Sequence, residues 1–181
     1  MTASDIFQRL SPGLSEQVLS FLQASDKPTY KVAIQTLATQ RKLRPVFVER
    51  KPRAERHVWM QTALSRPASE QIAANLLQMW LMGAQSGVLC DFLDALGIEH
   101  DEQGGIDTLP PCPEPEKLRA AVDGLLAKYP AETVTVYLQC FQGMDIAGWP
   151  PLAEMLANDE RLRLPTTQPA PTADTPTPDA G

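Results

Sequence analysis

Residues 67–97, PASEQIAANLLQMWLMGAQSGVLCDFLDALG, decide the fold class of this chain. Apolar residues recur every three or four positions along this stretch, which is the period of an α-helix with one buried face. Pro67 suits the first turn of one helix, and Gly97 suits the left-handed residue that ends the next. Gly83 and Gly87 loosen the pattern between them. The stretch therefore predicts two consecutive helices whose apolar faces pack on other helices.

The helical pattern continues on both sides of this stretch. Six further helices are expected, each beginning at an N-capping residue or a proline, and the markers are Ser11, Asp26, Pro52, Pro115, Pro130 and the Trp149-Pro150-Pro151 motif. Residues 133–138 alternate β-branched side chains as a strand does. A single strand would have no partner in such a chain, so we assign these residues to a helix.

We therefore predict an all-α protein of stacked antiparallel helical hairpins, either a bundle or a short α-solenoid of HEAT-like period. A shift of 49 residues places Leu76 on Leu125 and Phe92 on Phe141, which favours a faint internal repeat. A true repeat and a chance alignment of two amphipathic helix pairs both stay open at this point.

Two segments interrupt the helices and divide the chain. Residues 99–114, EHDEQGGIDTLPPCPE, contain two glycines, three prolines and five acidic residues, which is the composition of a loop. Residues 165–181 contain five prolines and five threonines and too few apolar side chains to offset the entropy of ordering, so we expect a disordered tail. Residues 3–98 would then form a larger helical part, and residues 115–164 a smaller part packed on it.

Composition limits the classes of function. The 181 residues are 43% apolar, enough to bury a core, and carry a net charge of −6. This balance argues against a general affinity for nucleic acid or for anionic membranes. The sequence has no apolar run of the roughly 20 residues that span a bilayer, no secretory signal and no CxxC pair among its three cysteines. We expect a cytoplasmic protein that does not associate with membranes.

The basic residues are concentrated in residues 41–56, RKLRPVFVERKPRAER. Seven of the sixteen basic residues lie here with two acidic ones, a local charge of +5 that leaves −11 for the rest of the chain. Arginine predominates, and its planar guanidinium suits contacts with carboxylate and phosphate. Val46-Phe47-Val48 separates two basic clusters and would be an interface anchor if exposed or a core anchor if buried. The candidate partner-binding residues are Arg41, Lys42, Arg44, Phe47, Arg50, Lys51, Arg53 and Arg56.

Three interpretations of this segment stay open. Its cations can pair with the chain's own carboxylates, dock an acidic segment of a partner protein, or bind nucleic-acid phosphate. We predict a non-enzymatic adaptor or regulatory protein with an acidic protein partner, and the alternative is a nucleic-acid-associated regulator. The negative charge of the remaining chain disfavours the alternative. A homodimer, in which the basic segment meets the acidic loop of a second copy, is a further alternative.

No catalytic motif or metal-ligand set is recognisable. No serine lies in a GxSxG elbow, and Gly104-Gly105 does not follow a strand. Cys90 lies in an apolar helical pattern, which raises the pKa of a thiol and does not activate it. His100 stands among carboxylates but lacks the nitrogen or sulfur ligands that zinc prefers. The sequence therefore predicts no enzyme, no cofactor and no metal.

Overall fold

The computed structural model describes residues 1–106, 108–144 and 148–165. Within these ranges every regular element is a helix, which confirms the predicted all-α fold. From residue 166 onward the predicted tail lies outside the described residues. None of the described helices has both the length and the apolar character that a membrane span requires.

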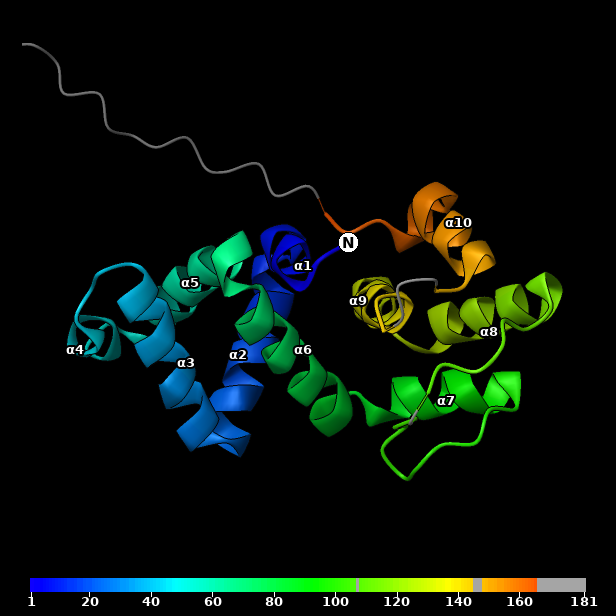
Figure 1. Cartoon of the computed structure of the whole chain (residues 1–181), viewed down its shortest axis with the longest axis horizontal. Helices are drawn as coiled ribbons and strands as arrows, with labels where there is room; N and C mark the ends of the chain where they lie inside the picture. The colour runs from blue at the N-terminus through cyan, green and yellow to red at the C-terminus, as the bar shows by residue number, and fades with distance from the viewer. Residues whose placement is uncertain (107, 145–147, 166–181) are drawn as a thin grey trace, which may run out of the picture.

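The helices form two groups, which lie side by side in Figure 1. The first group contains α1 (Ala3–Arg9), α2 (Pro12–Ser25), α3 (Lys27–Gln40), α4 (Pro45–Glu49), α5 (Arg53–Leu64), the 3-10 turn η1 (Pro67–Ser69) and α6 (Glu70–Ala84). The second contains α7 (Ser86–Leu96), α8 (Pro115–Lys128), α9 (Ala131–Gln142), α10 (Pro150–Asn158) and the 3-10 turn η2 (Glu160–Leu162). Only Gln85 separates α6 from α7.

Helix starts in the first group follow the predicted capping residues. The Ser11 hydroxyl accepts a hydrogen bond from the Leu14 amide at 3.1 Å, and the Asp26 carboxylate accepts one from the Thr29 amide at 3.0 Å. Each cap satisfies an amide that has no partner inside its helix. Local sequence therefore determines where α2 and α3 begin.

Residues 133–138 lie inside α9, so their assignment to a helix is confirmed. All six are buried, including the two threonines. The Thr135 hydroxyl donates a hydrogen bond to the Ala131 carbonyl oxygen at 2.8 Å, so this buried polar group has a partner within the helix. Because every face of the helix is buried here, the alternation of threonine and valine does not indicate one buried and one exposed face, as it would in a strand.

Two short helices, α1 and α4, have no counterpart in the sequence-based prediction. Helices of seven and five residues are too short to be stable alone and depend on tertiary contacts. In α1 the contact is a carboxylate of α6, because Glu70 accepts hydrogen bonds from the Ala3 and Ser4 amides, both at 2.8 Å. Ile6 and Phe7 of α1 are buried in the core of the first group.

The second group is built on an aromatic cluster. Phe92 of α7 meets Phe141 of α9 edge-to-face at 5.3 Å, and Phe141 meets Trp149 at 4.8 Å. The Trp149 indole N–H donates to the Pro110 carbonyl at 3.0 Å, which fixes the far end of the acidic loop to the same cluster. The helices on either side of the loop, α7 and α8, pack antiparallel, since Lys128 pairs with Asp91 at one end.

A carboxylate of α9 links the two groups. Glu132 accepts a hydrogen bond from the Ser11 amide at 2.6 Å and another from the Ser11 hydroxyl at 2.7 Å. The same hydroxyl oxygen accepts from Leu14, so one residue connects the start of α2 to the start of α9. Charge-assisted hydrogen bonds of this kind contribute about 1.5–3 kcal/mol each when partly buried.

Replacing Glu132 by alanine should therefore destabilise the protein. We expect Glu132→Ala to lower the free energy of unfolding by about 2 kcal/mol and the melting temperature by about 4–8 °C. Urea and thermal unfolding at pH 7 measure both quantities. Glu154→Ala is the matched control, because Glu154 is exposed on α10 and has no hydrogen bond among the described residues. Equal stability of the two variants would show that Glu132 does not hold the groups together.

Candidate interaction surface

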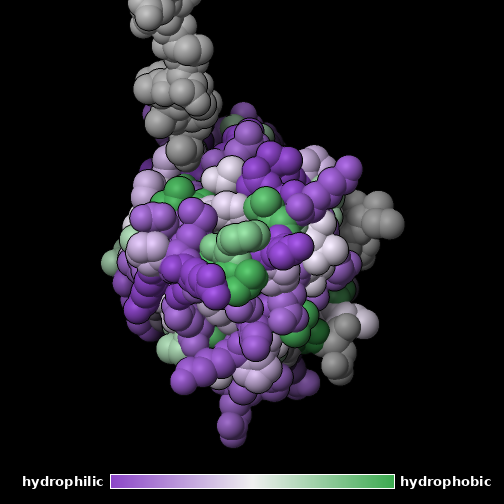
Figure 2. Space-filling model, turned by 90° about the vertical axis from the view of Figure 1, so that its left-hand side faces the viewer, coloured by the Kyte–Doolittle hydropathy of each residue, from purple (hydrophilic) through white to green (hydrophobic). Residues whose placement is uncertain are grey.

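The segment 41–56 lies at one end of the first group, where α3, α4 and α5 meet (Figure 1). Figure 2 shows this end of the molecule, with apolar side chains at its centre and hydrophilic side chains around them. The large apolar residues exposed in the segment are Leu43, Val46 and Phe47, and Phe47 is 59% exposed. We call these three residues, together with the basic residues of 41–53, the α3–α5 surface.

The short helix α4 divides the Val46-Phe47-Val48 strip between core and solvent. Successive residues of a helix point about 100° apart, so neighbours cannot all face the same side. Val48 is 1% exposed and anchors α4 in the core, whereas Phe47 faces outward. Val48 is therefore buried, as a core anchor must be, and Phe47 is exposed, as an interface anchor must be.

Four of the basic residues make no side-chain hydrogen bond or ion pair among the described residues. Lys42, Arg44 and Arg50 are exposed, and their side chains make no hydrogen bond or ion pair in that part of the chain. Arg41 lies with its guanidinium 5.7 Å from the centroid of the half-buried Trp59 ring. Such cation–π contacts orient an arginine without using its hydrogen-bond donors. These four cations are thus available to another molecule.

Two other cations pair with the chain's own carboxylates, as the first interpretation requires. Arg53 lies 3.4 Å from a carboxylate oxygen of Glu16 in α2 and donates to the Ser20 hydroxyl. Lys51 pairs with Glu55 one turn along, at 3.6 Å. Exposed pairs of this type contribute little to stability.

Arg56 has a structural position beneath the surface. Its guanidinium donates to the Tyr30 hydroxyl at 3.2 Å and to the backbone carbonyls of Glu49 and Lys51 at 3.0 and 3.4 Å. Those carbonyls belong to the turn between α4 and α5, so Arg56 closes that turn. Nothing in the spacing of the sequence identifies Tyr30 as its partner, because 26 residues separate the two.

A buried histidine supports the same region. His57 is 2% exposed, and its Nδ1 lies 2.6 Å from a Glu16 carboxylate oxygen. Burial lowers the pKa of His57, although the carboxylate opposes the change, so the neutral ring donates from Nδ1 to Glu16. Nε2 is buried without a hydrogen-bond partner among the described residues, as suits an unprotonated nitrogen.

Lys42 holds an unusual backbone conformation at the edge of the surface. Its φ of +55° lies in the left-handed region, where side chains other than glycine are strained. The Lys42 amide donates to Thr39 and the Leu43 amide to Ala38, which is the Schellman pattern that ends a helix. Glycine is the usual residue at this position. A lysine at this position costs strain that a glycine would avoid, but it places a cation next to the exposed apolar strip.

The acidic loop is ordered around one carboxylate. Asp101 Oδ1 accepts hydrogen bonds from the Gln103 and Gly105 amides at 2.8 and 2.7 Å. Gly104 adopts a φ of +77°, and a Cβ there would lie 2.4 Å from the Leu89 Cβ, so only glycine allows this approach to α7. The sequence predicts a loop here but not this tight turn.

His100 precedes that turn and faces two acceptors. Its Nδ1 lies 2.6 Å from the Asp101 carbonyl oxygen, and its Nε2 lies 3.2 Å from an Asp94 carboxylate oxygen. Both nitrogens must donate to satisfy both acceptors, which favours the imidazolium. The hydrogen bond to the Asp101 carbonyl and that to Asp94 therefore raise the pKa of His100.

Within the described residues there is no group of three or more His, Cys, Asp or Glu side chains that could hold a metal ion. Comparisons of the chain with protein-family models, with curated proteins and with solved structures found no match. The function must therefore be inferred from the surface itself.

Relieving the strain at Lys42 should stabilise the protein. We expect Lys42→Gly to raise the free energy of unfolding by about 0.5–1 kcal/mol, because glycine adopts the left-handed conformation without steric cost. Lys42→Ala removes the same charge but keeps the strain, and it should give no gain. Urea unfolding at pH 7 compares the three proteins. An equal gain in the alanine variant would assign the effect to the charge.

The two histidines should titrate on opposite sides of their ordinary pKa of 6.5. Neutral His57 contributes stability above pH 6.5 that is lost as the pH falls through its lowered pKa. Charged His100 contributes stability below pH 6.5 that is lost as the pH rises through its raised pKa. An NMR pH titration of the imidazole C–H signals should show one midpoint below and one above 6.5, with the upper one missing in His100→Gln. Two midpoints on the same side would contradict this assignment.

Proposed function

We propose that this chain is a non-enzymatic adaptor or regulatory protein of the cytoplasm that binds an acidic segment of a partner protein through the α3–α5 surface. The observation that carries the proposal is the exposed Phe47 side chain, which lies within five residues of Lys42, Arg44 and Arg50, three exposed cations that have no ion pair among the described residues. Apolar centres with arginine at their edges are typical of the positions that dominate interface energetics.

Phe47 is suited to supply the affinity. Its exposed fraction of 59% amounts to roughly 100 Å² of apolar surface, whose burial in a complex is worth about 3 kcal/mol. Val46 and Leu43, also exposed, extend the apolar area beside it. Because α4 is fixed by Val48 in the core, Phe47 loses little freedom on binding.

The unpaired cations are suited to supply the specificity. Pairs between exposed charges add little affinity, but a patch of one sign speeds association with a partner of the opposite sign. The partner segment that fits carries carboxylates on either side of an apolar side chain. The net charge of −11 on the remainder of the chain favours a small, locally acidic partner over a long polyanion, because it repels the polyanion.

Charge reversal should slow the association of such a partner. We expect Arg44→Glu/Arg50→Glu to lower the association rate about tenfold at low salt and to weaken its salt dependence. Phe47→Ala should instead raise the dissociation rate about 30-fold, equivalent to about 2 kcal/mol. A partner captured at low salt from a native extract and then purified provides the ligand for surface-based kinetics.

Matched controls separate the surface from charge and hydrophobicity in general. Lys27→Glu/Lys31→Glu makes the same change of charge at the other end of α3, and Val32→Ala removes an apolar side chain that is 58% exposed. Both should bind as the unmodified protein does. Nuclease treatment that abolishes capture, with a log–log salt slope of roughly −4, would support the nucleic-acid-associated regulator instead. Capture that none of the surface variants affects would end the proposal.

A further inference from the structure

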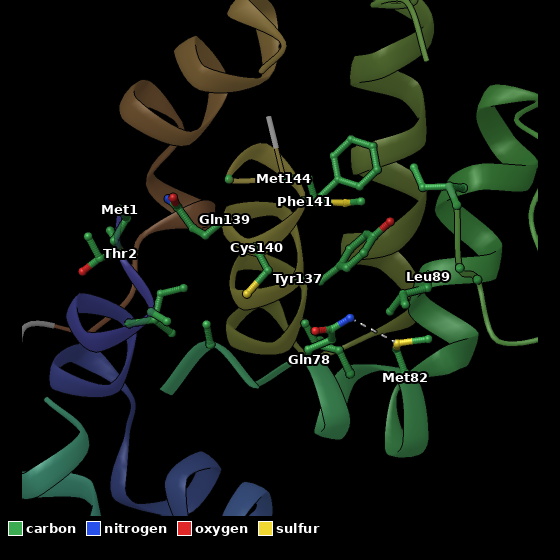
Figure 3. A pocket seen from close by; sticks show the side chains of 18 of the residues that line it. Met1, Thr2, Gln78, Met82, Leu89, Tyr137, Gln139, Cys140, Phe141 and Met144 are labelled. Carbon is green, nitrogen blue, oxygen red and sulfur yellow. Dashed lines mark hydrogen bonds between the residues drawn. The ribbon is translucent and has the colours of Figure 1, made fainter. Parts of the chain in front are cut away.

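A cavity of about 440 Å³ lies between the two groups of helices, away from the α3–α5 surface. Its walls are α6 on one side and α9 on the other, with the start of α1 at one end and the turn at 104–106 at the other (Figure 3). Cavities that bind small molecules have volumes of roughly 300–1,000 Å³ and favour the junction between two structural units. Both the size and the position of this cavity suit a ligand.

The lining is mostly apolar and adaptable. Aliphatic and aromatic side chains form the walls, among them Ile6, Ala74, Leu81, Leu89, Ile106 and Phe141. Three methionines, Met1, Met82 and Met144, also line it, and methionine adapts its shape to different ligands. The stretch of α6 from Ala74 to Met82 covers two turns, or roughly 12 Å, so the cavity is elongated along this helix.

The charged side chains at the cavity are acidic. Glu70 is the charged side chain among the described residues that line it, and its carboxylate is held by the Ala3 and Ser4 amides. The Asp101 carboxylate lies behind the wall that Gly105 forms, 2.7 Å from the Gly105 amide. These two carboxylates disfavour a ligand that carries a carboxylate of its own.

Apart from Glu70, the polar side chains of the lining are neutral. Tyr137 is 4% exposed, and its hydroxyl is buried without a hydrogen-bond partner in the part of the chain that the structure describes. A ligand does not reach this hydroxyl, but the half-buried side chain of Gln139 also lines the cavity, and its amide can hydrogen-bond to a ligand. Gln139 and Cys140 project from α9 towards the α1 end (Figure 3). Burial raises the pKa of the Cys140 thiol to about 12, so it stays uncharged.

We propose that this cavity binds an uncharged, elongated apolar molecule that carries one hydrogen-bonding group, of the class of a medium-chain aliphatic alcohol or ester. Such a ligand contacts α6 of the first group and α9 of the second, so its binding holds the two groups together. This site is independent of the α3–α5 surface, and either proposal can fail without the other.

The test uses the neutral fluorescent probe N-phenyl-1-naphthylamine with the full chain. We expect saturable enhancement of its fluorescence at one site per chain, displacement by 1-decanol and no displacement by decanoate at the same concentration. Ala74→Trp fills the cavity from α6 and should weaken probe binding about tenfold or more. Asn75→Trp adds the same ring to the next residue of α6, which does not line the cavity, and should leave binding within about twofold.

Two further variants make the result decisive. Gln78→Trp obstructs the cavity from an exposed position of α6 and replaces Ala74→Trp if that variant fails to fold. Gln139→Leu should weaken 1-decanol binding about three- to tenfold, because it removes the amide that hydrogen-bonds to the alcohol. Probe binding that neither tryptophan in the cavity weakens would overturn the site. Displacement by decanoate as strong as that by 1-decanol would overturn the assignment to uncharged ligands.

Discussion

Each of the first two helices begins on a carboxylate from a distant part of the chain. Glu70 of α6 accepts the first amides of α1, and Glu132 of α9 accepts both donors of Ser11. The start of a helix exposes amides without partners and carries a partial positive charge, and a carboxylate compensates for both. Glu70 therefore stabilises the seven-residue α1 against α6, and the Glu132 side chain connects α2 to α9. Of these contacts, the one between Glu132 and Ser11 joins the two helical groups.

The α3–α5 surface relies on a second polar network, which lies underneath it. Arg56 holds the turn between α4 and α5, and His57 contacts Glu16 on the neighbouring helix α2. The cations of the segment thus serve two purposes that cannot be exchanged. Arg56 stabilises the turn between α4 and α5, and the exposed cations lie on the segment that this turn makes rigid. Rigidity of this kind reduces the entropy lost when a partner binds.

Local features of the fold were predictable from sequence, and features that depend on distant residues were not. Ser11 and Asp26 act on amides three residues away, so their caps can be identified without knowing the fold. The basic segment could likewise be located. Its division into paired and unpaired cations could not, because Arg53 finds its partners in α2, more than thirty residues earlier. The cavity is beyond such reasoning altogether, since α1, α6, α9 and the 104–106 turn contribute its walls from separate segments.

The turn around Asp101 has a consequence for how the chain tolerates changes in length. One carboxylate closes this turn, and Gly104 rests directly on α7. An extra residue between Gln103 and Gly105 would lift the backbone away from Leu89 and open one end of the cavity. Residues 111–114, by contrast, are mostly exposed and follow the Pro110 carbonyl that Trp149 holds. Insertions should accumulate in the second half of this connection and be rejected in the first.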